Sequence, residues 1–308
     1  MRTLLYLSLG LAPALTGVAQ AEENRIELRN LAARVVVTTQ PRADIDVRVK
    51  SGPKAMPQVT LSRSGGKVVV SGNVSGSSQS CGSGSNIFAF NFGDRNVTTV
   101  RVAGKGQVNL GDLPVVYIYA PENLQIVSNG AVYGTVNSSA QLKLNVHGCG
   151  DWQLGSVRGP LSILSTGSGD IHASNAGDTE IISGGSGDVH IGNVRGLKLS
   201  QSGSGDVGIG SVSGALSTAT SGSGDISVGT VNGPVEISVA GSGDVTLAKG
   251  SITRLKIAIA GSGDVHFGGD ADMVEAAIVG SGDIFVARAN GTVQKSVLGS
   301  GDISIGRH

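Results

Sequence analysis

The sequence predicts an all-β protein whose main part is a single-stranded parallel β-solenoid, with about 18–20 residues and two strands in each coil. Three observations support this fold class. The quartet Gly-Ser-Gly-Asp recurs at a nearly constant interval, apolar residues alternate on both sides of it, and variation in length is confined to one connection. A period this short and steady is typical of a solenoid, in which each repeat stacks on the one before.

The quartet marks one corner of each coil. It occurs eight times, and an imperfect copy, Gly148-Cys149-Gly150-Asp151, precedes these eight. Successive aspartates, counted from Asp151, are separated by 19, 18, 18, 19, 19, 20, 19 and 19 residues. The aspartates of the eight full quartets are Asp170, Asp188, Asp206, Asp225, Asp244, Asp264, Asp283 and Asp302.

Two strands per coil are predicted from alternating apolar residues. One strand follows the aspartate, because the residues one and three places after it are apolar, as in Ile226 and Val228. The other strand precedes the quartet, where the residues nine, seven and five places before the aspartate are mostly apolar, as in Val235, Ile237 and Val239. Such a period of two is the inward face of a strand, so the quartet is the corner between two strands.

The second connection of each coil absorbs all the variation in length. It runs from five residues ("SNAGD") to seven ("AKGSITR"), whereas the spacing around the quartet never changes. Every unit also reads alike, which favours parallel stacking over antiparallel hairpins with two kinds of turn. The crossover rule favours a right-handed path.

The composition of the quartet suits a sharp corner. Glycine adopts backbone angles that other residues avoid, and its missing side chain prevents a collision with a coil only about 4.8 Å away. The serine and aspartate are expected to bond backbone N–H groups that the turn leaves unpaired. The alternative is a calcium-binding ladder of the eight aspartates. Stacked carboxylates about 5 Å apart repel by ~0.9 kcal/mol in water, and calcium takes several carboxylate ligands.

Residues 1–21 are predicted to be a secretory signal peptide. Arg2 precedes an apolar run from Leu4 to Leu15, and Ala19-Gln20-Ala21 forms a small-residue cleavage site. Neither this run nor any other stretch reaches the roughly 20 apolar residues that span a bilayer. We therefore expect an exported protein, periplasmic or extracellular, without a membrane span.

Residues 22–112 are predicted to form a β region that caps the solenoid or supplies early coils, and residues 113–308 to form the quartet-repeat solenoid. "RIELRN", "RVVVTT" and "DIDVRVK" read as strands, and a hairpin is expected to turn at Ser64-Gly65-Gly66. The two cysteines, Cys81 and Cys149, lie in glycine-rich loops. An exported chain with two cysteines most simply forms one disulfide.

The composition argues against several classes of function. Acidic and basic residues number 23 each, so no net charge attracts nucleic acid or an anionic membrane. No catalytic triad, paired carboxylate cleft or phosphate loop stands out, so we expect no enzymatic activity and no cofactor. His172 and His190 share one position in adjacent coils, but two imidazoles alone are a weak metal site. A polysaccharide-binding or polysaccharide-cleaving β-helix is the alternative, although aromatic residues make up only 3%.

Outward-facing positions predict a surface for a partner. Glu236, Lys256 and Glu275, eight places before their aspartates, alternate in sign, which supports parallel register. Beside them we expect a strip of small and apolar residues, which suits contact with a protein or another component of the cell envelope. The strip consists of Ala240, Ala260, Val279 and Leu298.

The last quartet coil is expected to be a second contact surface. Only Arg307 and His308 follow it, so its edge carries unpaired backbone groups, a template for another chain. We expect a homo-oligomer in which two copies meet through this end or through the strip. The side chains expected to be half open to water are Val293, Val297, Ile303 and Ile305.

These features resemble a known family. The repeated "GSGD(V/I)xhG", the segment "LPVVYIYAPENLQIVSNGAVYG" at 113–134 and the exported context are similar to the head GIN domain, a bacterial adhesin family of unknown function, and to the broader adhesin β-repeat family. The resemblance implies a right-handed β-helix without established catalytic residues. Together with the residue patterns, it favours a secreted, non-catalytic β-solenoid that presents a rigid surface for cell-envelope or adhesive contact.

Overall fold

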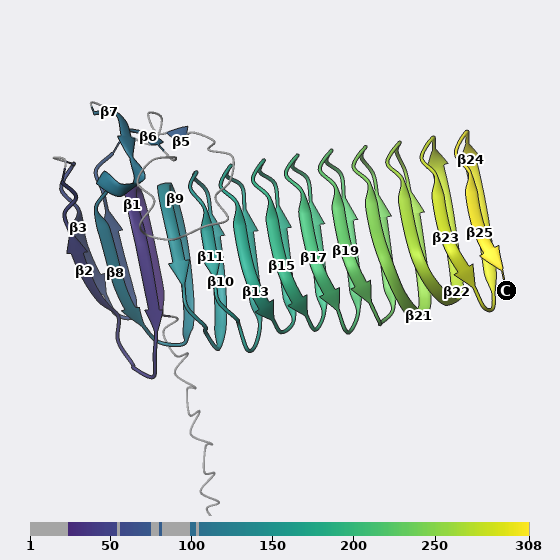
Figure 1. The fold of residues 1–308 in the computed structure, drawn as a ribbon, viewed down its shortest axis with the longest axis horizontal. Coiled ribbons are helices and arrows are strands. Elements are labelled where there is room, and N and C mark those ends of the chain that lie inside the picture. The colour runs from purple at the N-terminus through teal and green to yellow at the C-terminus, as the bar shows by residue number, and fades with distance from the viewer. Residues whose placement is uncertain (1–23, 54–55, 75–79, 82–98, 103–104, 308) are drawn as a thin grey trace, which may run out of the picture.

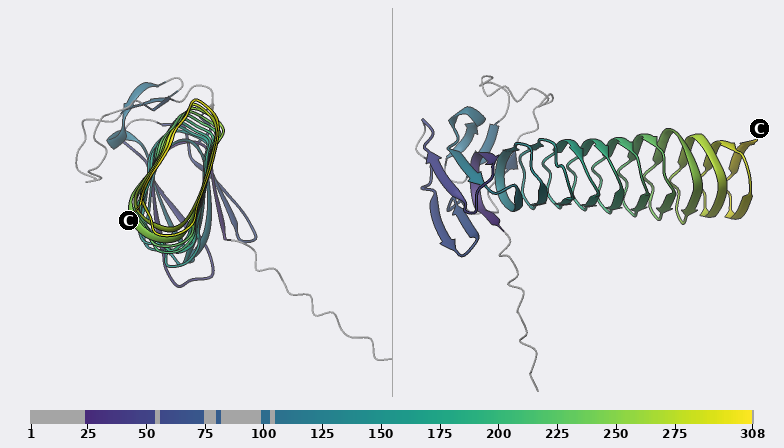
Figure 2. Two further views of the ribbon diagram at one scale, coloured as in Figure 1. Left: turned by 90° about the vertical axis from the view of Figure 1, so that its right-hand side faces the viewer. Right: turned by 90° about the horizontal axis from the view of Figure 1, so that it is seen from below.

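The structure, a computed structural model, describes residues 24–53, 56–74, 80–81, 99–102 and 105–307 (Figure 1). Within these ranges the chain forms strands and one short 3-10 helix, η2 (Leu110–Asp112). The predicted signal peptide, residues 1–21, lies outside the described residues. The strands stack into a long rod, and along its axis the coils superimpose on one flattened outline (Figure 2).

The coils form two parallel sheets, which we call sheet I and sheet II. Sheet I holds the strands that follow the aspartates: β11 (Trp152–Leu154), β13 (Ile171–Ala176), β15 (Val189–Val194), β17 (Val207–Val212), β19 (Ile226–Val231), β23 (Ile284–Ala289) and β25 (Ile303–Arg307). Sheet II holds the strands that precede the quartets: β10 (Gln141–Val146), β12 (Leu161–Ser165), β14 (Thr179–Ser183), β16 (Leu197–Gln201), β18 (Leu216–Thr220), β20 (Val235–Val239) and β24 (Val293–Gly299). Three long strands bend from one sheet into the other: β9 (Asn123–Val136), β21 (Val245–Ile259) and β22 (Val265–Gly280).

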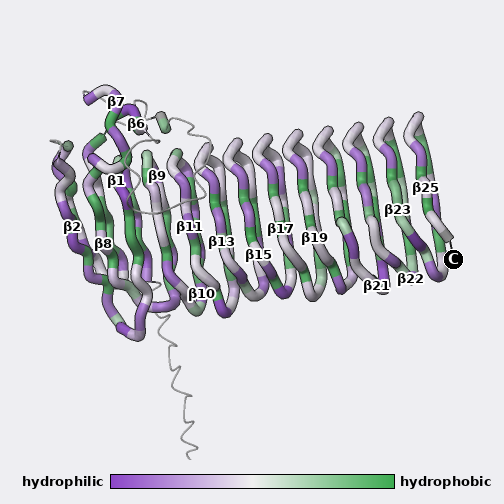
Figure 3. Tube along the Cα trace, in the orientation of Figure 1, coloured by the Kyte–Doolittle hydropathy of each residue, from purple (hydrophilic) through white to green (hydrophobic). Residues whose placement is uncertain are grey.

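The predicted parallel β-solenoid is confirmed, and its register follows the aspartates. Ile171 pairs with Val189 and Val189 with Val207, each one place after an aspartate. In sheet II, Glu236 pairs with Lys256, each eight places before an aspartate. Equivalent residues of successive coils therefore form straight rows along the rod. Figure 3 shows the hydrophobic positions repeating along the strands, with pale corners at the quartets.

Strand β1 (Arg25–Thr39) joins the N-terminal region to the solenoid, because it pairs in parallel with β9. β1 also pairs in parallel with β8 (Val115–Ala120) and with β4 (Lys67–Ser71). β2 (Asp46–Lys50) is the antiparallel neighbour of β8, and β3 (Thr60–Ser64) is the antiparallel neighbour of β4. The hairpin predicted at Ser64-Gly65-Gly66 is confirmed by the pairing of β3 with β4. The segments "RIELRN" and "RVVVTT", predicted as strands, are both part of the single strand β1. Asn30, with a φ of 47°, bends the chain at a bulge between Leu28 and Leu31, and the strand continues.

A small antiparallel sheet lies beside this region and consists of β5 (Ser80–Cys81), β6 (Thr99–Val102) and β7 (Gly106–Asn109). Val100, Val102 and Val108 of this sheet share a buried apolar cluster with Ala131 and Tyr133 of β9. The sheet is thus packed against the early part of the solenoid. The proposed division of the chain at residue 112 remains a prediction.

Apolar side chains fill the space between sheets I and II. Ile226, Val228 and Ile237 are each 1% exposed, as expected for inward rows. The row five places before the aspartates departs from the expectation in the middle coils, where it is polar but still buried. Its members there are Ser165, Ser183, Gln201 and Thr220.

Candidate functional site

The aspartates form a hydrogen-bonded ladder along the quartet edge of the rod. The Oδ1 atom of each aspartate from Asp151 to Asp283 accepts the backbone N–H of the aspartate one coil further on, with N···O distances of 2.7–2.9 Å. The main-chain carbonyl takes part too, as Asp244 shows by accepting the N–H of Ile226 at 2.8 Å. The expectation that the carboxylates satisfy backbone N–H groups is therefore confirmed.

The ladder accounts for the aspartates without an ion. Each carboxylate from Asp151 to Asp283 has one oxygen bonded to a backbone N–H, which offsets the repulsion between neighbouring coils. Among the described residues, no group of three or more His, Cys, Asp or Glu side chains is placed to hold a metal ion. The calcium alternative stays a prediction to be tested.

The quartet glycines are required mainly by the close approach of successive coils. A Cβ on Gly167 would lie 1.8 Å from the carbonyl oxygen of Gly148, and a Cβ on Gly185 would lie 1.9 Å from that of Gly167. The expectation that unusual backbone angles demand glycine was wrong for most quartets. Among quartet glycines, φ values in the left-handed region occur at Gly150, Gly280 and Gly299.

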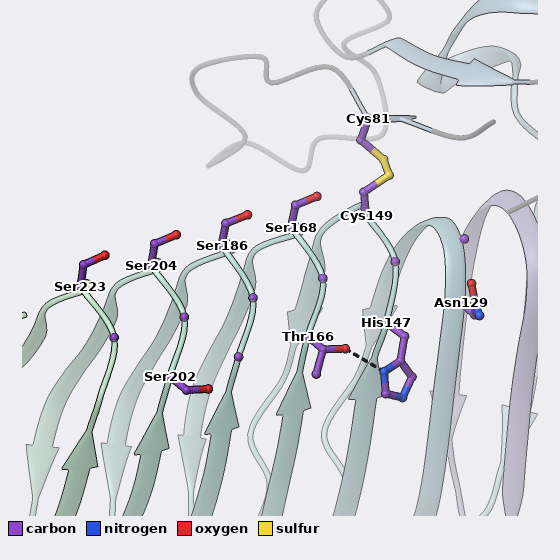
Figure 4. A pocket seen from close by; sticks show the side chains of 17 residues that line it. Cys81, Asn129, His147, Cys149, Thr166, Ser168, Ser186, Ser202, Ser204 and Ser223 are labelled. Atoms are coloured by element: carbon purple, nitrogen blue, oxygen red, sulfur yellow. Dashed lines mark hydrogen bonds between the residues drawn. A yellow bond between two sulfur atoms is a disulfide. The ribbon is translucent and has the colours of Figure 1, made fainter. Parts of the chain in front are cut away.

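The missing side chains leave a polar groove along the quartet edge, with a volume of about 870 Å³, which we call the quartet groove (Figure 4). Glycines form its floor, and hydroxyl groups line it on both sides, including those of Thr166, Ser168, Ser186 and Ser204. The His147 Nδ1 and Thr166 Oγ1 atoms are 2.8 Å apart and hydrogen-bonded. Sequence analysis missed this groove, although glycines flanked by serines in every quartet were a visible signal for it.

One end of the quartet groove is bounded by a disulfide. Cys81 of β5 is joined to Cys149 of the imperfect quartet, with a Cα–Cα distance of 5.8 Å and a sequence separation of 68. This is the pairing predicted from the sequence. The bond attaches the small β5–β7 sheet to the first turns of the quartet solenoid.

Further along the same edge, the rod surface becomes apolar. The strip predicted from the sequence, consisting of Ala240, Ala260, Val279 and Leu298, is exposed at all four positions. Val279 is 56% and Leu298 is 72% exposed, and the two residues are paired neighbours on β22 and β24. We call these four residues the apolar strip.

In the last coil, Val293, Val297 and Ile305 are partly open to water, as expected, whereas Ile303 is buried. Val297 is 45% exposed, but Ile303 is only 6% exposed, because it packs against the core of the coil before it. Val293 and Ile305 are partly buried against the same core. Lys295 also occupies an inward row, and its Nζ donates a hydrogen bond to the carbonyl oxygen of Ile303 at 2.7 Å.

The charged row beside the apolar strip contains ion pairs between coils. Lys256 Nζ lies 3.0 Å from Glu236 Oε1, and Lys198 Nζ lies 3.1 Å from Glu180 Oε1. The hydrogen bond with Glu236, together with the charge of Glu275, raises the pKa of Lys256. The predicted alternation of charge thus produces contacts along the rod, although exposed pairs of this kind contribute little to stability.

The two histidines singled out in the sequence meet on sheet I. The rings of His172 and His190 are stacked, with centroids 5.2 Å apart and planes inclined by 7°. His190 is exposed, whereas His172 is half-buried. Burial and the neighbouring His190 lower the pKa of His172, so its neutral form is favoured.

An acid surrounded by three bases lies at the N-terminal end of the rod. Glu27 is 5% exposed and pairs with Lys67 and Arg25 at 2.8 Å each, and with Arg29. Burial alone raises the pKa of Glu27, but the contacts with Lys67, Arg29 and Arg25 outweigh it and lower the pKa to about 2. Glu27 therefore stays ionised, which suits a structural ion-pair cluster.

The fold and this edge define the class of protein, a parallel β-solenoid whose coils are linked by an aspartate ladder. The family model described as Toastrack DUF4097 matches residues 23–305, and the chain belongs to this family. A closer relation to the head GIN domain, expected from the repeats, stays a prediction.

The chain is similar to the crystal structure of a "putative adhesin" from Bacteroides fragilis NCTC 9343, with 14% identity, 91% of each chain covered and a TM-score of 0.32. No curated protein matches the chain. In the part of the chain that the structure describes, no helix combines the length and hydropathy needed to cross a membrane.

Proposed function

We propose that this protein is an exported, non-catalytic rod that presents the apolar strip to a protein or another component of the cell envelope. The observation that carries the proposal is the exposure of Val279 and Leu298 side by side on a rigid sheet. Large apolar side chains gathered on one surface mark contact sites more often than isolated ones do.

The rigid strands that carry the apolar strip suit the binding of a partner better than catalysis. The strip lies on paired strands whose coils are held in register by the aspartate ladder, so little conformational freedom is lost when a partner binds. The nearby row of Glu236, Lys256 and Glu275 supplies a polar rim of alternating sign. An apolar centre with a polar rim is the usual anatomy of a protein interface.

Export to the periplasm or the cell exterior fits the covalent structure. Disulfides persist in oxidising compartments and are rare in the cytosol. The disulfide between Cys81 and Cys149 and the signal peptide predicted at residues 1–21 agree on this point. A relation to the head GIN domain implies the same adhesive setting.

The proposal is tested with fluorescently labelled protein on intact cells and isolated envelopes of the source organism. A double variant, Val279→Ser with Leu298→Ser, should reduce retention by about tenfold, because it removes the apolar centre and leaves the buried rows intact. The matched control is Ile182→Ser, which replaces an exposed apolar side chain on sheet II outside the apolar strip. Equal retention of the wild type and the double variant would contradict the proposal.

A further inference from the structure

A second groove runs along the outer face of sheet I, away from the apolar strip. It has a volume of about 520 Å³ and crosses five successive strands, β13, β15, β17, β19 and β21. We call it the sheet I groove. It serves neither the aspartate ladder nor the proposed contact surface, so its shape needs a separate explanation.

Packing between coils holds the floor of the sheet I groove free of side chains. The floor lies four places after the aspartates and contains Gly192, Gly210 and Gly229. A Cβ at these positions would come within 2.0, 2.4 and 2.6 Å, respectively, of a carbonyl oxygen in the coil before. The depth of the groove is therefore a fixed property of the backbone.

One wall of the groove carries an aromatic surface. His172 and His190 stack on each other, and the next position in the same row is Gly208. A Cβ on Gly208 would lie 2.8 Å from the His190 ring, so the ring face not covered by His172 turns along the groove toward Gly208. Beyond the glycine, Ser227 and Thr246 place hydroxyl groups in the same row.

The two imidazoles are arranged for stacking, and their geometry is unsuited to holding a metal ion between them. Zinc binds imidazole nitrogen at about 2.0–2.1 Å along the direction of the lone pair, which lies in the ring plane. In His172 and His190 the ring planes are almost parallel and 5.2 Å apart at their centroids, so the lone pairs do not converge. The pair instead offers a ring face to a ligand.

The electrostatic surroundings select against an anionic ligand. The lining of the sheet I groove contains no Asp, Glu, Lys or Arg. The aspartate ladder runs beside the row of the groove that holds the histidines and hydroxyl groups. Each aspartate lies two places before a member of that row, as Asp188 does before His190 and Asp206 before Gly208. No carboxylate of the eight quartets is ion-paired with another described residue. A polyanion would meet uncompensated negative charge along the whole border of the groove.

We propose that the sheet I groove binds one neutral sugar unit of an oligosaccharide, with the plane of the sugar ring lying across the rod. The apolar face of one sugar stacks on the ring of His190, and Ser227 and Thr246 exchange hydrogen bonds with sugar hydroxyls. The second carboxylate oxygens of Asp188 and Asp206, which the ladder leaves unused, accept further sugar O–H groups. A concave, mostly apolar site with a few polar groups is typical of small-ligand recognition.

This site is independent of the proposed contact function, since it lies on other strands than the apolar strip. The test starts with the mature protein on a glycan array of neutral and acidic linear oligosaccharides, followed by isothermal titration with the best neutral ligand. We expect neutral ligands to be retained and uronic-acid oligomers to be excluded. Retention of no neutral ligand, or equal retention of acidic ones, would overturn the proposal.

Matched variants then test the ring of His190. His190→Ala should weaken the affinity about tenfold, because the stacking surface is lost, whereas His190→Phe should bind within about threefold of the wild type. His266→Ala, a change on the same row outside the groove, is the control and should bind normally. An unchanged affinity in His190→Ala, with its fold verified by circular dichroism, would refute the proposed role of the ring.

Discussion

Two substitutions of one ladder aspartate distinguish the contribution of the hydrogen-bond acceptor from that of the negative charge. Asp225 lies in the middle of the rod, where its N–H donates to Asp206 Oδ1 at 2.8 Å and its own Oδ1 accepts the N–H of Asp244 at 2.9 Å. Asp225→Asn keeps an acceptor oxygen at the same place and removes the charge. Asp225→Ala removes the acceptor as well.

The expected magnitudes differ between the two variants. A hydrogen bond to a charged group contributes about 1.5–3 kcal/mol, and the exposed position of Asp225 brings the loss in Asp225→Ala to about 1–2 kcal/mol. In Asp225→Asn, a weaker hydrogen bond is offset by relief from the two neighbouring carboxylates, each worth ~0.9 kcal/mol in water at about 5 Å. We therefore expect Asp225→Asn to change the free energy of unfolding by less than about 0.5 kcal/mol.

Urea unfolding followed by circular dichroism measures the change in the free energy of unfolding of both variants. The midpoint and the slope of each unfolding curve are compared with those of the wild type, because a repeat protein can lose coils in steps. The measurements are made with calcium and with a chelator. Equal destabilisation by asparagine and alanine would refute the acceptor argument. A strong rise in stability with calcium, abolished in Asp225→Asn, would instead show an ion in the ladder.

Four other predictions follow from contacts described above. Gly185→Ala should destabilise by about 1–3 kcal/mol, because its Cβ would lie 1.9 Å from a backbone oxygen, whereas the adjacent Gly184→Ala, with 3.4 Å to the nearest atom, should be nearly neutral in the same urea assay. Reduction of the disulfide, which closes a 68-residue separation, should lower stability by about 4 kcal/mol in the chain-entropy model; a melting temperature unchanged by reductant would contradict this. Because the pKa of Glu27 is about 2 in the fold against 4.5 ordinarily, its ion pairs stabilise the protein above about pH 4.5. That contribution should fall progressively toward pH 2, and Glu27→Gln should remove it from acid-unfolding curves. Light scattering should show a dimer of the wild type at high protein concentration, and Leu298→Lys should abolish this dimer, because it places a charge in the apolar strip. A monomeric mass of the wild type at every concentration would contradict the prediction that two copies meet through the strip.

The solenoid could be predicted because its information is local and repeated. The residues one and three places after each aspartate, such as Ile226 and Val228, point inward in every coil, so one copy corroborates the next. The constant spacing around the quartet fixes the register, since a slip of one residue would turn each row to the other face. The aspartates could be predicted as acceptors of backbone N–H groups for the same reason, because they recur at the same place in every coil.

The N-terminal region and the grooves could not be predicted in the same way. β1 pairs with β9 about a hundred residues away, and no repeated pattern in the sequence encodes that contact. The quartet groove and the sheet I groove arise from missing side chains at Gly185 and Gly210, whose effect depends on how closely coils approach. The stacking of His172 on His190 depends on ring orientation, which alternation of residue types does not determine.

The hydrogen bonds of the aspartate ladder all run in one direction, and this gives the rod a polarity of growth. In every pair the carboxylate belongs to the coil nearer the N-terminus and the N–H to the coil that follows. A finished coil therefore offers a carboxylate acceptor to the segment made next, while a coil added from the other side meets the backbone N–H and carbonyl groups of the aspartate and no carboxylate acceptor. Since a chain emerges N-terminus first, each completed coil is a template for its successor, and the rod can lengthen in the order in which it is synthesised.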